Sequence, residues 1–394
     1  MAHRLSDRIN NLPVSQTLSM AAKARELRSQ GVDIISLSLG EPDFNTPDFI
    51  KDAAKKAIDE DYNWYTPVDG YLDLREAICR KFKRDNGLDY TPNQIVVSTG
   101  AKQSLANVAM VLLNPGDEAL LPAPYWVSYE AIVNLCEAKP VPISTSVERD
   151  FKITPEQLEA AITPKTKLIF FNSPNNPSGA IYSKAELRAL ADVLVKHPTI
   201  YVISDEIYEH IIYEGSVFSM AAFEDMYANT ITINGLSKAF AMTGWRVGYL
   251  GAPEWIAKAC TKMQGQITSG TNCIAQRAAI TALDAPVSKI KYMVDEFKER
   301  RSLVLGLLQE IPGFITKNAP GAFYFFPDVS YYFGKTLQGV KINNATDLSL
   351  YILEKANVAT VTGDAFGSPN CIRLSYATSR ELLIEAIGRI KSVL

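Results

Sequence analysis

The sequence predicts an α/β protein with a large domain, in which helices flank a mostly parallel β-sheet, and a smaller α+β domain. Three observations support this prediction. The chain has 394 residues, which exceeds the size at which one hydrophobic core usually stops growing. In its middle part, short and continuously apolar segments alternate with helical patterns. After residue 291, a long charged helical pattern and an aromatic segment replace this alternation.

The N-terminal part is expected to be an arm followed by one helix. Residues 13–31 carry apolar side chains at helical spacing among Lys and Arg and end at a glycine. Residues 34–39 predict a short strand that ends at the motif Gly-Glu-Pro-Asp-Phe, residues 40–44. A proline in the first position then predicts a helix over residues 47–59.

The strands expected in the large sheet are compact apolar runs. They are continuous rather than alternating, as in strands that helices cover on both faces. These runs are residues 95–97, 119–121, 168–171, 201–203, 231–233 and 247–250. The crossovers that parallel strands need are expected to be the helical stretches 102–113, 184–196 and 255–263.

The C-terminal part predicts the smaller domain. Its expected elements are a helix over 293–308, an aromatic segment at 323–326, a helix near 345–356, strands at 358–361 and 371–374, and a closing amphipathic helix. We therefore expect a large domain over residues 46–288 and a small domain over 289–394. Residues 1–45 are expected to form an arm and the first part of the small domain.

Composition narrows the class of protein. The net charge is −3 and the 40 Lys and Arg form no long run, which disfavours nucleic acid and favours a small neutral or anionic metabolite. No apolar stretch is long enough to predict a membrane span. The five cysteines form no CxxC motif, which is typical of reduced thiols in a cytoplasmic protein. With three histidines, no metal site is expected, and His210 is interpreted as structural or surface.

Lys238 is the first candidate for chemistry. It lies among small and apolar residues, 234–240, and Arg246 follows eight positions later. Desolvation lowers the pKa of a lysine, so that its neutral amine can attack an aldehyde and shuttle protons. Most lysines lie on the surface, so this interpretation needs support from other motifs.

Two further motifs follow apolar strands, where ligand crevices of open α/β sheets form. The first is residues 172–179, Asn-Ser-Pro-Asn-Asn-Pro-Ser-Gly, in which we single out Asn176; a plain turn is the alternative. The second is Ser-Asp-Glu-Ile-Tyr, residues 204–208. A desolvated Asp205 would need a cation such as a protonated pyridine nitrogen, and Tyr208 could donate its hydroxyl to a phenolate. Alternatively, Asp205 caps a helix.

Anion-binding groups complete the set of candidates. Residues 98–104 predict a strand that ends in small residues at a helix start, where backbone amides and the helix dipole favour a phosphate. Arg246 is a second candidate phosphate ligand. Arg373 lies in the middle of a predicted strand and needs a carboxylate, either from a substrate or from an internal salt bridge.

Together these motifs resemble the fold-type I, class I aminotransferases that depend on pyridoxal phosphate, and most closely the bacterial aspartate aminotransferases typified by thermophile enzymes. The resemblance covers nearly the whole chain in order. Its motifs are residues 172–179, 204–208, 237–246 and 370–376, together with 40–44 and 124–129. The resemblance implies a seven-stranded sheet in the large domain and a homodimer with shared active sites.

The resemblance assigns roles around the cofactor. Lys238 would form the Schiff base with pyridoxal phosphate and carry the proton between the reacting carbons. Asp205 would keep the pyridine nitrogen protonated, which sustains the electron sink. Tyr208 and Asn176 would hydrogen-bond the phenolic oxygen, and Trp126 would stack on the ring.

The phosphate is expected to be held by Arg246 and the backbone amides of Gly100 and Ala101, with Tyr65 reaching it from the neighbouring subunit. One position departs from the pattern. Many relatives carry serine where this chain has Gly235, so one phosphate hydrogen bond is either missing or supplied by backbone.

The substrate α-carboxylate is expected to bind Arg373, with the Gly40 backbone, Trp126 and Asn176 around it. Acidic-substrate members of the branch carry a lysine where this chain has Lys102.

The ammonium of Lys102 would pair with the side-chain carboxylate of aspartate, and Ser15 and Thr17 could close over it. The resemblance therefore implies transfer of an amino group from L-aspartate to 2-oxoglutarate. The alternatives are an aromatic, alanine or prephenate aminotransferase, or a β-elimination lyase of the same fold. The expected partners are amino acids and 2-oxo acids.

Overall fold

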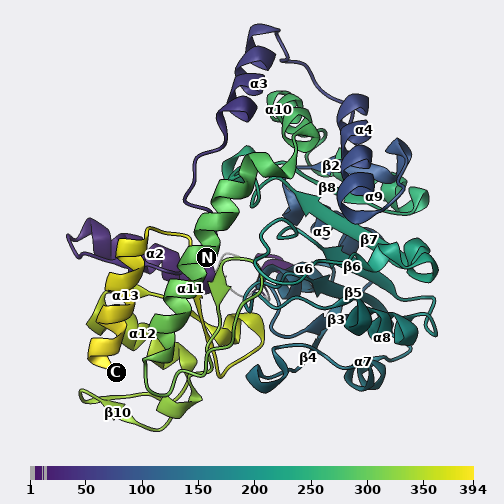
Figure 1. Ribbon diagram of the computed structural model, residues 1–394. Coiled ribbons are helices and arrows are strands. Elements are labelled where there is room, and N and C mark those ends of the chain that lie inside the picture. The colour runs from purple at the N-terminus through teal and green to yellow at the C-terminus, as the bar shows by residue number, and fades with distance from the viewer. Residues whose placement is uncertain (1–4, 11, 13–15) are drawn as a thin grey trace.

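A computed structural model describes residues 5–10, 12 and 16–394 (Figure 1). Within this part of the chain, the largest sheet has seven strands in the order β2-β8-β7-β6-β5-β3-β4. Their bounds are β2 (Ile95–Ser98), β3 (Glu118–Pro122), β4 (Lys139–Ile143), β5 (Thr166–Asn172), β6 (Tyr201–Asp205), β7 (Thr230–Gly235) and β8 (Gly248–Gly251). β8 runs antiparallel to β2 and β7, and the other neighbouring pairs are parallel. The predicted fold class is confirmed.

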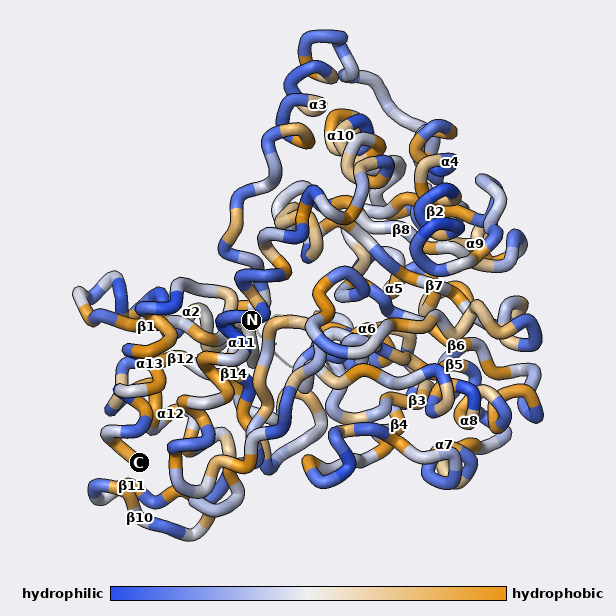
Figure 2. The backbone as a smooth tube through the Cα atoms, viewed as in Figure 1, coloured by the Kyte–Doolittle hydropathy of each residue, from blue (hydrophilic) through white to orange (hydrophobic). Residues whose placement is uncertain are grey.

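Helices cover both faces of this sheet because its strands bury alternate residues on opposite sides. Leu168 and Phe170 of β5 pack with α5 (Ala101–Leu112), α6 (Ser128–Leu135) and α9 (Glu254–Ile267) in one core cluster. Ile169 and Phe171 pack on the opposite face, with α7 (Pro155–Ala161) and α8 (Lys184–Leu194). Figure 2 shows the strands as largely hydrophobic segments beneath more hydrophilic outer turns.

A further cluster covers the β2 and β8 end of the sheet. It joins β2, through Ile95 and Val97, to three helices: α3 (Asp48–Asp59), α4 (Leu72–Lys81) and α10 (Cys273–Asp284). The α3 helix begins at Asp48, one residue later than predicted, with Pro47 immediately before it. Among the described residues, no helix combines the length and apolar character that a membrane crossing requires.

The C-terminal part packs around its own core beside the large sheet (Figure 1). Its helices are α11 (Lys291–Gln309), α12 (Ala345–Ala356) and α13 (Arg380–Val393). An antiparallel sheet of β13 (Val361–Thr362), β14 (Ile372–Ser375) and β9 (Tyr324–Phe325) lies with them. The hairpin β10 (Thr336–Leu337) and β11 (Val340–Lys341) completes this part.

The N-terminal segment joins the C-terminal part. Its elements are α1 (Asp7–Asn10), α2 (Gln16–Ser29) and β1 (Ile35–Ser36), and β1 pairs in parallel with β12 (Val358–Ala359). The strand expected over residues 34–39 is therefore shorter than predicted. The strand expected over 358–361 is divided into β12 and β13. Backbone pairing sets these bounds: β12 hydrogen-bonds with β1, whereas β13 hydrogen-bonds with β14.

Candidate active site

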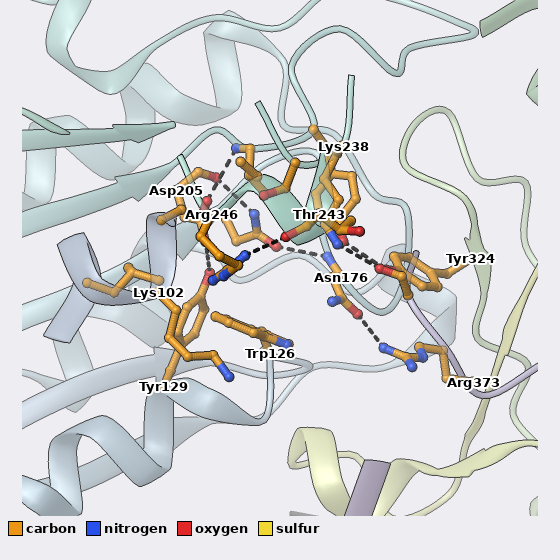
Figure 3. Close-up of a pocket in the computed structure, with 17 residues that line it drawn as sticks. Lys102, Trp126, Tyr129, Asn176, Asp205, Lys238, Thr243, Arg246, Tyr324 and Arg373 are labelled. Atoms are coloured by element: carbon orange, nitrogen blue, oxygen red, sulfur yellow. Dashed lines mark hydrogen bonds between the residues drawn. The ribbon is translucent and has the colours of Figure 1, made fainter. Parts of the chain in front are cut away.

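A cavity of about 280 Å³ lies where the central parallel strands end and the C-terminal part meets them (Figure 3). The last residues of β5 and β6, Asn172 and Asp205, form part of its wall. The structure brings most of the predicted site residues together here. Those that line the cavity are Gly40, Ala101, Lys102, Trp126, Asn176, Asp205, Tyr208, Lys238, Arg246 and Arg373.

Lys238 follows β7 and reaches into the cavity, where its Nζ donates a hydrogen bond of 2.6 Å to the Gly40 carbonyl oxygen. Burial lowers the pKa of Lys238 to about 8, and Glu41 opposes this effect while Arg373 and Arg246 add to it. About a tenth of this side chain is therefore a neutral amine at pH 7, against less than about a thousandth for an ordinary lysine.

Asp205 is a buried carboxylate at the end of β6, with 4% of its surface exposed. Its Oδ2 accepts a hydrogen bond of 2.7 Å from the Tyr129 hydroxyl, and its Oδ1 accepts one of 3.2 Å from the Ile207 amide. Burial raises the pKa of Asp205 to about 6, against the lowering effect of these donors. No helix begins at Glu206, so the helix-cap interpretation is wrong; a turn follows the strand.

Arg373 of β14 is 2% exposed, and no carboxylate pairs with it among the described residues. It donates to Asn176 Oδ1 at 3.0 Å and to the Ser38 carbonyl oxygen at 2.5 Å. Its Nε atom has no hydrogen-bond partner there. The internal salt bridge that the sequence left open is therefore not present, and a ligand carboxylate would satisfy the guanidinium.

The Asn176 side chain is fixed by its backbone and by Arg373. The backbone N–H of Asn176 donates to Asn172 Oδ1 at 2.8 Å, and Asn172 Nδ2 in turn donates to the Asp205 carbonyl oxygen at 2.8 Å. Because Asn176 Oδ1 accepts from Arg373, its Nδ2 is the group that can donate to a ligand.

The anion-binding part of the cavity is formed by Arg246 and the start of α5. Arg246 donates to the Thr243 carbonyl oxygen at 2.9 Å, and its guanidinium occupies the position that a Cβ of Gly100 would take. Gly100 therefore leaves room for the Arg246 guanidinium but does not itself line the cavity. A Cβ at Gly235 would lie 2.9 Å from the Val247 carbonyl oxygen, so glycine permits the close approach of β7 and β8.

Lys102, in the first turn of α5, extends over Trp126 with its Nζ 4.7 Å from the ring centroid. Partial burial lowers the pKa of Lys102, and the charge of Arg246 lowers it further. Trp126 lies edge to face with Tyr129 at 5.7 Å. The ammonium of Lys102 thus lies at the cavity (Figure 3) with no ion-pair partner among the described residues.

Three predicted residues remain: one is described away from the cavity lining, and the side chains of the other two lie outside the described residues. Tyr65 is fully exposed and does not line it in this single chain. Ser15 falls outside the described residues. Thr17 belongs to α2, but its side chain also falls outside what the structure describes.

Two tyrosines that the sequence analysis did not single out also line the cavity. Tyr129 lies in the first turn of α6, three residues after Trp126, which precedes this helix; the available signal was its place in the motif at 124–129. Tyr324 contributes a hydroxyl that lies 2.8 Å from the Tyr208 hydroxyl. The available signal for Tyr324 was its hydroxyl within the aromatic segment 323–326. A buried tyrosine hydroxyl usually has a hydrogen-bond partner, so this residue was a candidate for a polar contact.

Comparison with known proteins agrees with this geometry. The family model "Aminotransferase class I and II" matches residues 32–390. The aspartate/prephenate aminotransferase of Cereibacter sphaeroides is 48% identical over 98% of each chain. The solved aspartate aminotransferase of Rhizobium meliloti superposes with a TM-score of 0.97 at 44% identity, covering 100% of this chain and 99% of that one.

A second solved structure, the aspartate aminotransferase of Thermus thermophilus with maleate, superposes with a TM-score of 0.93 at 40% identity and covers 100% of each chain. The family model spans far more than half of the chain, and these relatives are similar along its full length. The resemblance seen in the motifs is confirmed. The chain belongs to the class I and II aminotransferases.

Proposed function

We propose that the protein transfers the amino group of L-aspartate to 2-oxoglutarate, which gives oxaloacetate and L-glutamate, with pyridoxal phosphate as the cofactor. One observation carries this proposal. A buried guanidinium that has no carboxylate partner among the described residues, Arg373, faces the same cavity as an amine of lowered pKa, Lys238. An α-amino acid or 2-oxo acid supplies the carboxylate that the first group needs, and the second group reacts with carbonyl carbon.

The donor set of the cavity fits the cofactor. When bound, pyridoxal phosphate supplies an aldehyde that combines with amines and a ring that accepts electrons. Asp205, buried with two donors on its carboxylate, would hold a protonated ring nitrogen. Tyr208 and the Nδ2 of Asn176 would donate to the phenolic oxygen, and the Trp126 ring would cover one face of the cofactor.

The phosphate would be held by Arg246 and by the amides of Gly100 and Ala101 at the start of α5, where the helix dipole favours an anion. We propose that Tyr65 reaches this phosphate from a second subunit, which makes the protein a homodimer with shared sites. Its complete exposure in the single chain is compatible with this role, because its hydroxyl is free to reach a ligand bound to a second subunit.

The substrate would be held at both ends. Arg373, with the Gly40 backbone, Trp126 and Asn176, would bind the α-carboxylate. Lys102 would pair with the side-chain carboxylate, because its ammonium lies at the same cavity and has lost part of its hydration. Ser15 and Thr17 would close over that end of the substrate. Lys238 would then move the proton at the substrate α-carbon.

Two broader features remain proposals. We propose domain boundaries near residues 45 and 288, because α11 and β1 pack with the C-terminal core cluster whereas α3 and α10 pack against the large sheet. The cytoplasm is the proposed compartment on the basis of the cysteine pattern.

Prephenate is a second candidate amino acceptor, because the name of the relative from Cereibacter sphaeroides includes it. An assay that varies the acceptor tests the proposal. We expect loss of aspartate to require 2-oxoglutarate and to yield glutamate in equal amount. Oxo acid release without any acceptor would identify a lyase instead. Turnover with prephenate and none with 2-oxoglutarate would favour the second candidate.

A further inference from the structure

Tyr324 connects the two halves of the cavity. It is fully buried in β9, and β9 pairs with β14, the strand that carries Arg373. Its hydroxyl lies 2.8 Å from the Tyr208 hydroxyl, while its ring centroid lies 4.7 Å from the guanidinium carbon of Arg373. One side chain thus contacts both the group proposed for the cofactor and the group proposed for the substrate carboxylate.

The direction of the hydrogen bond between the two tyrosines follows from donor counting. Each hydroxyl has one proton to donate and two lone pairs that accept. Burial raises the pKa of both Tyr208 and Tyr324 above the ordinary value, so both protons are retained. If Tyr208 donates its proton to a ligand oxygen, the bond between the hydroxyls requires Tyr324 to donate to Tyr208.

The surrounding backbone keeps the Tyr324 hydroxyl in place. A Cβ at Gly40 would collide with this hydroxyl, so the glycine allows the strand and the motif at 40–44 to approach each other. The Gly40 carbonyl oxygen is also the acceptor for Lys238. The hydroxyl therefore lies against the same residue that receives the reactive amine.

We propose that Tyr324 is a positioning residue that donates a hydrogen bond to Tyr208 and so strengthens the bond that Tyr208 donates to the phenolic oxygen of the cofactor. This inference rests on the proposed function. A hydroxyl that accepts a hydrogen bond is polarised and becomes a stronger donor. The contact between the Tyr324 ring and Arg373 is independent of the hydroxyl and would persist in a Tyr324→Phe variant.

A pH titration of the absorbance of the cofactor-loaded protein tests this role. The bound cofactor would supply an ionisable phenolic oxygen near the Lys238 nitrogen, and hydrogen-bond donors would stabilise the anionic form of that oxygen. Tyr324→Phe weakens this stabilisation, so we expect the midpoint to rise by about 0.2 to 0.7 pH unit. The KM for aspartate should change by less than about twofold, because the ring over Arg373 remains.

Two comparisons distinguish a relay from a general structural effect. In a Tyr208→Phe background, Tyr324→Phe should not shift the midpoint further, because the relay passes through Tyr208. Tyr376→Phe is the matched control. Tyr376 is also a buried tyrosine of this core, and it donates to the Ala322 carbonyl oxygen at 3.1 Å away from the cavity lining.

An unchanged midpoint in Tyr324→Phe would overturn the inference, and so would an equal shift in Tyr376→Phe or a full shift in the Tyr208→Phe background. A wild-type protein that develops no visible absorbance band with pyridoxal phosphate would instead contradict the proposed function, so the two failures are distinguishable.

Discussion

Lys102 lies at the cavity with its ammonium over Trp126 and with part of its hydration removed. Because an aspartate side chain would restore an anionic partner, we expect Lys102→Ala to lower kcat/KM for aspartate by about 10- to 100-fold. Turnover of phenylalanine, which has no second carboxylate, should change by less than about threefold. Steady-state kinetics with both amino acids measure the difference.

Lys184 provides a matched control for this substitution. Its ammonium lies at the same 4.7 Å from an aromatic centroid, that of Phe218, but outside the cavity. Lys184→Ala should leave the kinetics of both substrates unchanged. Equal losses for aspartate and phenylalanine in Lys102→Ala would refute the assignment of Lys102 to the side-chain carboxylate.

The lowered pKa of Lys238 predicts how fast the protein captures its cofactor. Only the neutral amine attacks an aldehyde, and burial moves the pKa of this amine from its ordinary 10.5 to about 8. The capture rate should rise as the pH increases through about 8 and level off above it. Stopped-flow absorbance after mixing apoprotein with pyridoxal phosphate measures this rate; a continued rise up to pH 10 would show an unperturbed lysine.

Residue types and spacing predicted part of the cavity, and the resemblance to the aminotransferases supplied Gly40, Lys102 and Trp126. Four polar residues follow or lie within an apolar strand, where burial of a polar side chain costs free energy unless it has a partner. They are Lys238, Asp205, Asn176 and Arg373. Tyr324 could not be predicted in this way, because its contact with Tyr208 depends on how the C-terminal part packs against the large sheet.

At the scale of elements, the turn after β6 that carries Tyr208 is anchored by a buried ionic cluster. Glu209 pairs with Lys81 at the end of α4 and accepts hydrogen bonds from Asn86 at 2.8 Å and from Asn234 at 2.7 Å. Burial alone would raise the pKa of Glu209, but Lys81, His210 and these donors lower it to about 2. His210 thus belongs to this cluster and is not a surface residue.

Breaking this cluster should be costly. We expect Glu209→Ala to reduce the free energy of unfolding by about 3 kcal/mol, because it removes the nearer carboxylate of the buried Lys81 and leaves only Asp85, at 3.9 Å. Asp52→Ala, which removes the partner of the exposed Lys55, should leave the free energy of unfolding nearly unchanged. Guanidinium titration of both apoproteins gives the comparison, and similar losses would show that the buried pair contributes no more than a surface pair.

Most elements could be predicted from apolar runs and helix signals, but β4 could not. Its sequence, Lys-Pro-Val-Pro-Ile, contains two prolines and is only partly buried, as fits its place at the edge of the sheet. The antiparallel direction of β8 was also beyond prediction, because an apolar run has the same appearance in either direction.

At the scale of the whole molecule, the proposed site, with Tyr65 supplied by a second subunit, requires two copies of the chain. We expect a mass in solution of twice the chain mass, and we expect Tyr65→Phe to weaken cofactor binding about tenfold or more through the loss of a hydrogen bond to phosphate. Tyr331→Phe, which alters an exposed tyrosine on the C-terminal part, is the control. Sedimentation and equilibrium titration measure both quantities. A monomer that binds the cofactor tightly would contradict the shared site.

The most direct test of the proposed amino-group transfer is the absorbance of the protein loaded with pyridoxal phosphate, recorded on addition of L-aspartate without any oxo acid. We predict that the visible band converts to an ultraviolet band in one stoichiometric step and that 2-oxoglutarate then restores it. Lys238→Ala should show neither change within the same time. A band that ignores aspartate but responds to phenylalanine or alanine would contradict the account.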